Sequence, residues 1–531
     1  MNTTSAEKGP GVGRLSTERK IAQVLMPFIS SGEDAAAIRR FADRHGIGGV
    51  FVMSGTRESI TGCLRDLQAA ADIPIVVSAD LEKGVPRRIS EGMTALPDLL
   101  ALSATGDEEL AYEYGRITAL EGRALGIHWT FAPVADVQKN PRNPITLNRC
   151  LGDDEERISR LLPPLIRGMQ DHGLAACAKH FPGDGHDCRD QHITTTVNPL
   201  AMEEWRAISA RPFVAAIGAG VHSIMPGHIA LPAWDPAKNR FGIHTPATLS
   251  RRITTDLLRG ELGFDGVVVS DAQGMGGITG VLPDRDRIIA SFNAGCDVLL
   301  FPDLERDAAF LREAVEAGRV TMARLDEAVS RILRLKEKLG LLDRKTLFHA
   351  NPSPQQLAAN GAIGRTICRR ALYPARAAEG LLPLKLAAGA RVLTVTLGWN
   401  FCDLSALDRE LEARGCRVTH LHNPDSPAFF YTARDYDLTC VNFGFTPEWA
   451  SNVNGCPGVH NRIFMDSFFN SPECPTLFTS FGNPFHLHEL PQLPNLLNAH
   501  ADGVESQKAV VDYWFGELDI SGNQSPVRCR P

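Results

Sequence analysis

Seven short apolar runs share one arrangement, and this arrangement leaves few folds open to the chain. Each run ends near a polar residue, and helical patterns separate one run from the next. Continuous apolar strands with helices between them indicate parallel strands whose faces are covered by helices. Because a polar residue follows nearly every run, the pattern favours a closed barrel with its site at the carboxyl rim; an open sheet would use only one or two strand ends. The runs cover residues 48–53, 74–79, 127–135, 173–178, 221–225, 266–270 and 297–301.

We therefore expect an α/β fold: a TIM-like (β/α)8 barrel of irregular or incomplete form, followed by a smaller α/β sandwich domain. An eighth strand is not evident. The apolar spacing of Ile21, Val24, Leu25 and Phe28 indicates a helix that seals one end of the core. Strand-like runs restart in the second half of the chain, at 392–397, 416–421, 436–442 and 475–480. The expected division is a flexible tail at 1–18, the catalytic barrel at 19–345, a linker at 346–375 and the second domain at 376–531.

Size and charge exclude several classes of function. A chain of 531 residues that is 44% hydrophobic can bury a large core. Its net charge of −7 argues against a nucleic acid or an anionic membrane as the main partner. The N-terminus holds no apolar leader, and no segment approaches the roughly 18 apolar residues of a membrane span. The 12 cysteines show no paired spacing, so we expect reduced thiols and a soluble cytoplasmic protein, whose oligomeric state the sequence leaves open.

The densest group of polar side chains follows the fourth run, over residues 179–192. Eight of these fourteen side chains are charged or imidazole, and Pro182 with two glycines stops any regular structure there. Asp190 and His192 are two residues apart, and a carboxylate beside an imidazole fixes its tautomer and raises its basicity. A zinc site and a purely structural loop are the alternatives, but the loop lacks a short HxxxH helix and a CxxC pair, so we expect no metal.

Four motifs in order along the chain carry a family resemblance. They are Asp80-Leu81-Glu82-Lys83-Gly84, the segment 131–136, the segment 179–183 with 190–192, and the segment 263–272. Together they resemble glycoside hydrolase family 3, and most closely its β-N-acetylglucosaminidase (NagZ-type) branch in the two-domain form. The resemblance runs from about residue 19 to the end, because segments 480–485 and 515–522 are similar to the second domain of such members.

The resemblance implies three catalytic residues. Asp271 matches the nucleophile, which forms a covalent glycosyl intermediate and retains the anomeric configuration. His192 matches the acid/base and Asp190 the residue that orients it. Asp271 fits this role independently, because it ends a buried strand at the barrel mouth, although a helix N-cap is the alternative for this carboxylate.

The resemblance also implies a set of sugar-binding residues. Carboxylates and guanidinium groups suit vicinal hydroxyls, because each can engage two at once. Arg88 and Arg149 could instead be surface charges, and Lys179 could pair internally with Asp136. The implied residues are Asp80, Arg88, Arg149, Lys179 and His180, with Met225 and His228 in an M-x-x-H motif at the rim.

Several positions depart from the family pattern. Lys83 and Val85 stand where the family has Gly and Arg, and Cys150 begins a segment that replaces Ser-Phe-Gly. Asp184 and His186 stand where the loop usually has His and Asp, so His186 becomes a rival acid/base. None of these changes removes a proposed catalytic group.

The function we expect is a retaining exo-β-N-acetylglucosaminidase that releases terminal GlcNAc from peptidoglycan fragments or chitooligosaccharides without a cofactor. A phosphorylase that uses the same residues is the first alternative, because a histidine acid/base leaves the intermediate open to phosphate. A β-glucosidase and a catalytically inactive sugar-binding protein are the others. The loops that would contact the leaving group show no recognisable sequence pattern, so the sequence leaves the identity of the leaving group open.

Overall fold

Eight parallel strands close into a barrel in the computed structural model, which describes residues 11–89, 92–399, 402–424, 433–447, 449, 451 and 475–530. Hydrogen-bonded pairs join the strands in chain order, and the last strand returns to the first. Single bridges, Trp129 to Ala175 and Val269 to Val298, complete the circuit where the ladders are short. The strands are β1 (Leu25–Met26) with β2 (Phe28–Ile29), β3 (Gly49–Val52), β4 (Val76–Ala79), β5 (Trp129–Thr130), β6 (Cys177–Phe181), β8 (Ser223–Pro226), β10 (Val267–Val268) and β11 (Leu299–Leu300).

The eighth strand precedes the seven that the sequence indicated. Its first piece, β1, pairs with β11, and its second piece, β2, pairs with β3, so this strand closes the barrel. Pro27 separates the pieces, and its carbonyl accepts a hydrogen bond from Phe51 N at 2.8 Å. The helical interpretation of Leu25 and Phe28 is therefore wrong. Proline lacks an N–H and disfavours helical geometry in the residue before it, so the helix ends at Val24.

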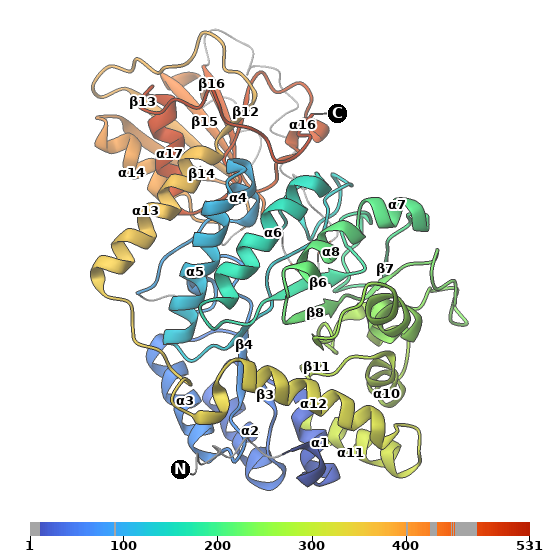
Figure 1. Ribbon diagram of the computed structural model, residues 1–531. Coiled ribbons are helices and arrows are strands. Elements are labelled where there is room, and N and C mark those ends of the chain that lie inside the picture. The colour runs from blue at the N-terminus through green and yellow to red at the C-terminus, as the bar shows by residue number, and fades with distance from the viewer. Residues whose placement is uncertain are drawn as a thin grey trace.

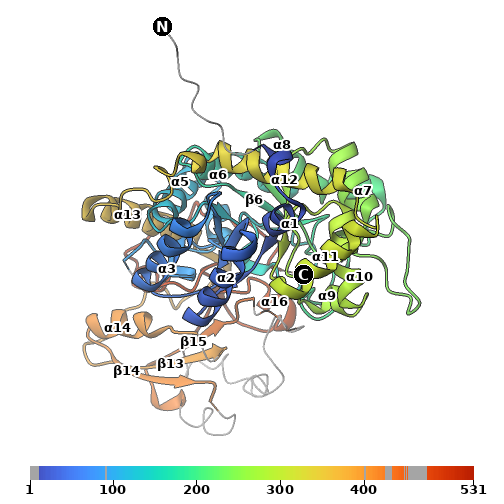
Figure 2. The same cartoon turned by 90° about the horizontal axis from the view of Figure 1, so that it is seen from below.

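Helices surround the barrel, and Figure 2 looks at this ring from below. Each covers the strands with an apolar face, which is the arrangement that continuous apolar strands require. The largest fully buried side chains of the core include Trp129, Phe51 and Phe131. The main helices of this half are α1 (Thr17–Val24), α2 (Gly32–His45), α3 (Arg57–Ala70), α4 (Leu99–Thr105), α5 (Glu108–Ala124), α6 (Glu155–Gln170), α8 (Ala210–Gly218), α10 (Asp284–Ala294), α11 (Leu304–Glu316) and α12 (Met322–Lys338).

A six-stranded sheet forms the second half of the molecule, in the order β12, β17, β16, β15, β13, β14, with only β12 antiparallel. One face packs with α14 (Ser405–Ala413) and α17 (Val504–Trp514), and the other shares a buried cluster with Leu100 and Leu147 of the barrel half. The expected α/β sandwich is therefore present, and Figure 1 shows it at the top, beside α4. The strands are β12 (Tyr373–Arg376), β13 (Arg391–Gly398), β14 (Arg417–His422), β15 (Leu438–Gly444), β16 (Thr476–Ser480) and β17 (Leu496–Asn498).

One long helix, α13 (Pro354–Ala371), connects the two halves along one side of the molecule (Figure 1). It lies inside the segment 346–375, which we propose as the linker between a barrel at 19–345 and a second domain at 376–531. Residues 1–10 of the proposed tail at 1–18 lie outside the described residues, and α1 begins at Thr17. None of the helices described is long and apolar enough to span a bilayer.

Candidate active site

Charged side chains from neighbouring strand ends meet at the carboxyl rim of the barrel. Asp80 directly follows β4, and Lys179 lies in β6, beyond the intervening β5. Lys179 Nζ lies 3.0 Å from Asp80 Oδ1 and 2.8 Å from Glu82 Oε1. Burial opposes the charge, but the two carboxylates hold the pKa of Lys179 above its usual value. Lys179 thus does pair internally, as the alternative had it, but its partners are Asp80 and Glu82 and not Asp136.

Both arginines of the predicted sugar site are held by carboxylates. Arg88 Nη2 lies 2.6 Å from Asp80 Oδ2, and Arg149 grips Glu82 with two hydrogen bonds of 2.9 Å from Nε and Nη2. Such a bidentate pair fixes the plane of the guanidinium. Neither arginine is a surface charge, since their side chains are only 21% and 16% exposed. Their remaining N–H groups are therefore presented in fixed directions.

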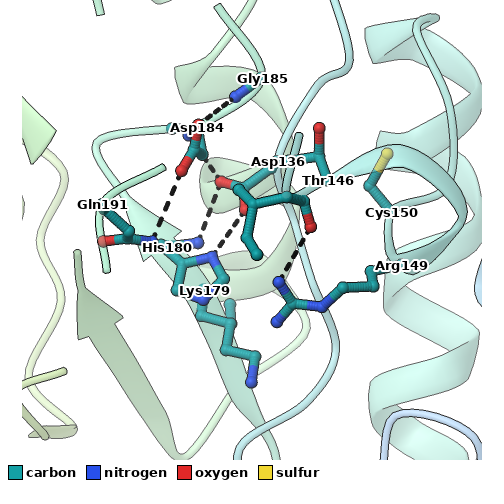
Figure 3. A network of polar contacts seen from close by, with 12 residues as sticks. Asp136, Thr146, Arg149, Cys150, Lys179, His180, Asp184, Gly185 and Gln191 are labelled. Carbon is teal, nitrogen blue, oxygen red and sulfur yellow. Dashed lines mark hydrogen bonds and ion pairs between the residues drawn. The ribbon is translucent and has the colours of Figure 1, made fainter. Parts of the chain in front are cut away.

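Asp136 organises the next part of the site (Figure 3). This fully buried carboxylate accepts from His180 Nδ1 at 2.7 Å and, through its other oxygen, from the backbone N–H groups of His180 and Asp184 at 3.0 and 2.7 Å. Because Nδ1 donates to Asp136, Nε2 is the ring nitrogen of His180 that can serve a ligand. Asp136 thereby sets the tautomer and orientation of a predicted sugar-binding residue.

Asp184 and His186, the two loop residues that depart from the family pattern, lie in different surroundings. Asp184 lies inside, where its Oδ1 accepts from Asn143 Nδ2 at 2.8 Å, and burial together with the charge of Asp136 raises its pKa to about 7. His186 turns to Ser209, with 3.0 Å between Nε2 and Oγ, and burial lowers the pKa of His186 to about 4. His186 thus makes a contact that anchors the loop.

The Asp190–His192 pair has the geometry of an acid/base dyad. His192 Nδ1 donates to Asp190 Oδ1 at 2.7 Å, and the backbone N–H of His192 donates to the same oxygen at 2.8 Å. Asp190 is fully buried, whereas the His192 side chain is 27% exposed. Burial opposes ionisation of Asp190, but bonding to His192 holds its pKa below the usual value. The ionised carboxylate leaves Nε2 of His192 to exchange a proton with a ligand.

Asp271 follows the strand that contains β10, at the same rim. Its Oδ1 accepts from Ala272 N at 2.7 Å, and the next helix, α9 (Gly276–Thr279), has Met275 at its N-cap. The N-cap interpretation of Asp271 is therefore wrong. Burial opposes ionisation of Asp271, but three nearby imidazoles hold its pKa below the usual value, so it is an anion at neutral pH. These imidazoles belong to His228, His180 and His192.

The two rim residues of the M-x-x-H motif are buried. Met225 lies in β8 and is 2% exposed, and His228 is 0% exposed. His228 Nε2 donates to Ala272 O at 3.0 Å, and Nδ1 lies 2.9 Å from Thr248 Oγ1. Burial lowers the pKa of His228, the charge of Asp271 opposes this shift, and both ring nitrogens are bonded to the protein. This histidine braces the backbone next to Asp271.

No role for Glu82 followed from the sequence, which suggested Asp136 only as a possible partner of Lys179. Glu82 links Arg149 to Lys179, and Asp136 holds His180. Both occur in motifs that the sequence displayed, but only the tertiary contacts give them partners. Within the described ranges, no group of three or more His, Cys, Asp or Glu side chains is arranged to hold a metal ion.

Comparisons with known proteins agree on one family. The family model described as "Glycosyl hydrolase family 3 N terminal domain" matches residues 16–335. A β-N-acetylglucosaminidase/β-glucosidase of Cellulomonas fimi is 33% identical over 559 aligned positions, which cover 99% of this chain and 95% of that protein.

Two solved structures share nearly the whole fold. A β-glucoside phosphorylase, BglX, bound to 2FGlc, superposes with a TM-score of 0.88 at 28% identity, over 98% of this chain and 95% of that one. A glycoside hydrolase family 3 β-N-acetylglucosaminidase from Paenibacillus sp. str. FPU-7 superposes with a TM-score of 0.85 at 26% identity, over 97% of this chain and 99% of that one.

Proposed function

Because the chain belongs to glycosyl hydrolase family 3 and is a glycoside hydrolase, we propose that it acts as a retaining exo-β-N-acetylglucosaminidase. It releases terminal GlcNAc from peptidoglycan fragments or chitooligosaccharides, without a metal or an organic cofactor. The observation that carries this proposal is the Asp190–His192 dyad, with its 2.7 Å bond, on the same rim as the ionised Asp271. The names of the Cellulomonas and Paenibacillus relatives support GlcNAc as the sugar.

In the first step, Asp271 attacks the anomeric carbon and the bond from that carbon to the glycosidic oxygen breaks. His192 Nε2 gives its proton to the departing oxygen, so that the leaving group departs as an alcohol. The buried Asp190 carboxylate accepts the hydrogen bond from Nδ1–H throughout and keeps the ring oriented.

In the second step, a water molecule attacks the anomeric carbon of the glycosyl-Asp271 ester. His192 Nε2 now accepts the proton of that water, and the ester bond breaks to regenerate the Asp271 carboxylate. Two inversions give net retention of configuration. Each step restores the protonation state that the other requires.

The paired charges at the rim give the sugar its orientation. We propose that the Asp80 carboxylate accepts hydrogen bonds from sugar hydroxyls. Lys179 and Arg88 hold the two carboxylate oxygens of Asp80 in place. Arg149 and His180 donate to the ring and to the N-acetyl arm, each fixed by a buried carboxylate. The family resemblance implies sugar contacts for Met225 and His228, but their burial favours a role in supporting the strand ends.

Phosphorolysis is the second candidate, and the similarity to the β-glucoside phosphorylase favours it specifically. A neutral imidazole does not repel an anion as a second carboxylate would, so phosphate can reach the glycosyl intermediate. Attack by a phosphate oxygen on the anomeric carbon would give GlcNAc 1-phosphate instead of GlcNAc.

The initial rate on 4-nitrophenyl β-GlcNAc beside 4-nitrophenyl β-glucoside tests the proposal. A preference for the GlcNAc substrate that is lost in Asp271→Asn supports it, and a preference for the glucoside overturns the sugar assignment. The same assay with inorganic phosphate separates the two candidates. Faster turnover with GlcNAc 1-phosphate as the product would establish the phosphorylase.

We also propose that the enzyme acts in the cytoplasm on soluble substrates. In the described part of the chain, ten cysteines are present as free thiols, most of them buried. Unpaired buried thiols are typical of proteins from a reducing compartment.

A further inference from the structure

The second half of the molecule touches the acid/base dyad directly. The backbone N–H of Ser451 donates to Asp190 Oδ2 at 3.2 Å, while Oδ1 of the same carboxylate holds His192. Ser451 lies seven residues beyond the end of β15, outside the matched family region 16–335. An ion pair, Lys83 with Asp502 at 3.2 Å, also joins the halves, next to Glu82 in the sequence. The sheet domain is therefore anchored to the rim at two points.

The same segment places an aromatic ring beside the acid/base. The ring of Trp449 lies 6.3 Å from the imidazole of His192, centroid to centroid, with an angle of 56° between the planes. Trp449 is 73% exposed, more than any other large apolar side chain of the described residues. Exposure of so large an apolar surface is unfavourable, and a ligand that covers the ring removes this cost.

The position of His192 decides which part of a substrate would cover that ring. His192 must reach the glycosidic oxygen, which joins the GlcNAc to its leaving group. The GlcNAc ring itself is bounded by Asp271 and by the paired charges around Asp80. A side chain next to His192 and open to solvent therefore faces the leaving group.

We propose that Trp449 is the binding platform for the leaving group, and that this leaving group is a pyranose sugar. The apolar C–H face of a pyranose stacks on an indole, and its hydroxyl edge stays in water. The hydrogen bond from Ser451 N–H to Asp190 fixes the position of this segment, and so of Trp449, relative to the dyad. This inference rests on the proposed function, because it uses His192 as the acid/base.

The test compares a substrate that has a sugar leaving group with one that has none. We expect Trp449→Ala to lower the ratio of kcat/KM for chitobiose to kcat/KM for β-GlcNAc fluoride about tenfold, and Trp449→Phe to restore most of this ratio. Phe241→Ala is the matched control, since Phe241 is also an aromatic side chain that is 67% exposed, and its ring packs against Arg240. A ratio in Trp449→Ala equal to that of the wild type would overturn the proposal.

A second readout does not depend on turnover. Binding of chitobiose and of GlcNAc to Asp271→Asn, with and without Trp449→Ala, is measured by calorimetry. A loss for chitobiose that exceeds the loss for GlcNAc supports the platform, and equal losses contradict it. If the wild type prefers glucosides, cellobiose replaces chitobiose and β-glucosyl fluoride replaces β-GlcNAc fluoride. A wrong sugar assignment then shows in the substrate preference of the wild type. A wrong assignment of Trp449 shows in the ratio of the two kcat/KM values.

Discussion

At the residue scale, two histidines on one loop have different surroundings, and this difference favours His192 as the acid/base that we propose. His192 is bonded to a buried carboxylate and is partly exposed at the rim. His186 contacts the hydroxyl of Ser209, and burial lowers its pKa to about 4. A general acid must hold a proton near neutral pH, which the lowered pKa of His186 disfavours, and of the two rings His192 is the one bonded to a carboxylate at the rim.

We expect His192→Ala to lower kcat/KM for chitobiose about 10²- to 10⁴-fold, the usual contribution of a general acid. The loss at the first step should be smaller on 2,4-dinitrophenyl β-GlcNAc, because this leaving group departs without a proton. His186→Ala is the matched control and should keep the wild-type dependence on the leaving group. Full activity on chitobiose in His192→Ala, together with a loss in His186→Ala, would show that the assignment is wrong.

At the scale of elements, a buried lysine joins the first and last helices of the barrel half. Lys336 of α12 is 0% exposed, and its Nζ donates to Gln23 Oε1 of α1 at 2.8 Å. Gln23 carries no charge to balance the ammonium, and burial lowers the pKa of Lys336 to about 7. The folded protein therefore binds this proton more weakly than the unfolded chain does.

The resulting stability should depend on pH in one direction. Between about pH 7 and 10 the unfolded chain keeps the proton of Lys336 and the folded protein loses it, so folding stability rises with pH through this window. Lys336→Met should remove this rise, which amounts to at most about 4 kcal/mol. Unfolding midpoints at pH 7 and 9.5 measure it, with the exposed Lys338→Met of the same helix as control. Parallel pH profiles for the wild type and Lys336→Met would contradict the prediction.

At the scale of the whole molecule, a three-membered ion cluster and a shared apolar cluster hold the halves together. Lys83 Nζ lies 2.8 Å from Asp98 and 3.2 Å from Asp502, which belongs to the second half. Asp98 is 1% exposed, and its burial raises its pKa to about 6. Lys83 stands where the family pattern has Gly, and it places a cation at the junction.

Loss of that cation should destabilise the molecule. Lys83→Met leaves Asp98 and Asp502 facing each other, and we expect a loss of about 3 kcal/mol at pH 8, as for other broken buried pairs. The loss should shrink at pH 5, where Asp98 is protonated in the folded state. Asp502→Asn in the same background should restore part of the stability, as unfolding midpoints would show. A double variant no more stable than Lys83→Met would contradict the expected repulsion.

The sequence indicated the polar groups at the barrel rim more completely than the closure of the barrel. Asp80, Asp190, His192 and Asp271, whose roles stay predictions, each stand at a fixed point of a local motif. The strand at 25–29 could not be predicted, because Pro27 divides it into two pieces of two residues, which are too short to show the alternation of a strand. Trp449 could not be identified, because a single exposed aromatic residue in a loop has no pattern around it.

The sequence by itself determined the kind and order of the elements and the chemical groups at their ends. These follow from the period of apolar residues and from turn residues, which act over a few positions. The tertiary structure alone decided which groups meet, because 99 positions separate Asp80 from Lys179 and 261 separate Asp190 from Ser451. Such contacts depend on closure of the barrel and on docking of the sheet domain. No local sequence pattern specifies contacts between residues so far apart in the chain.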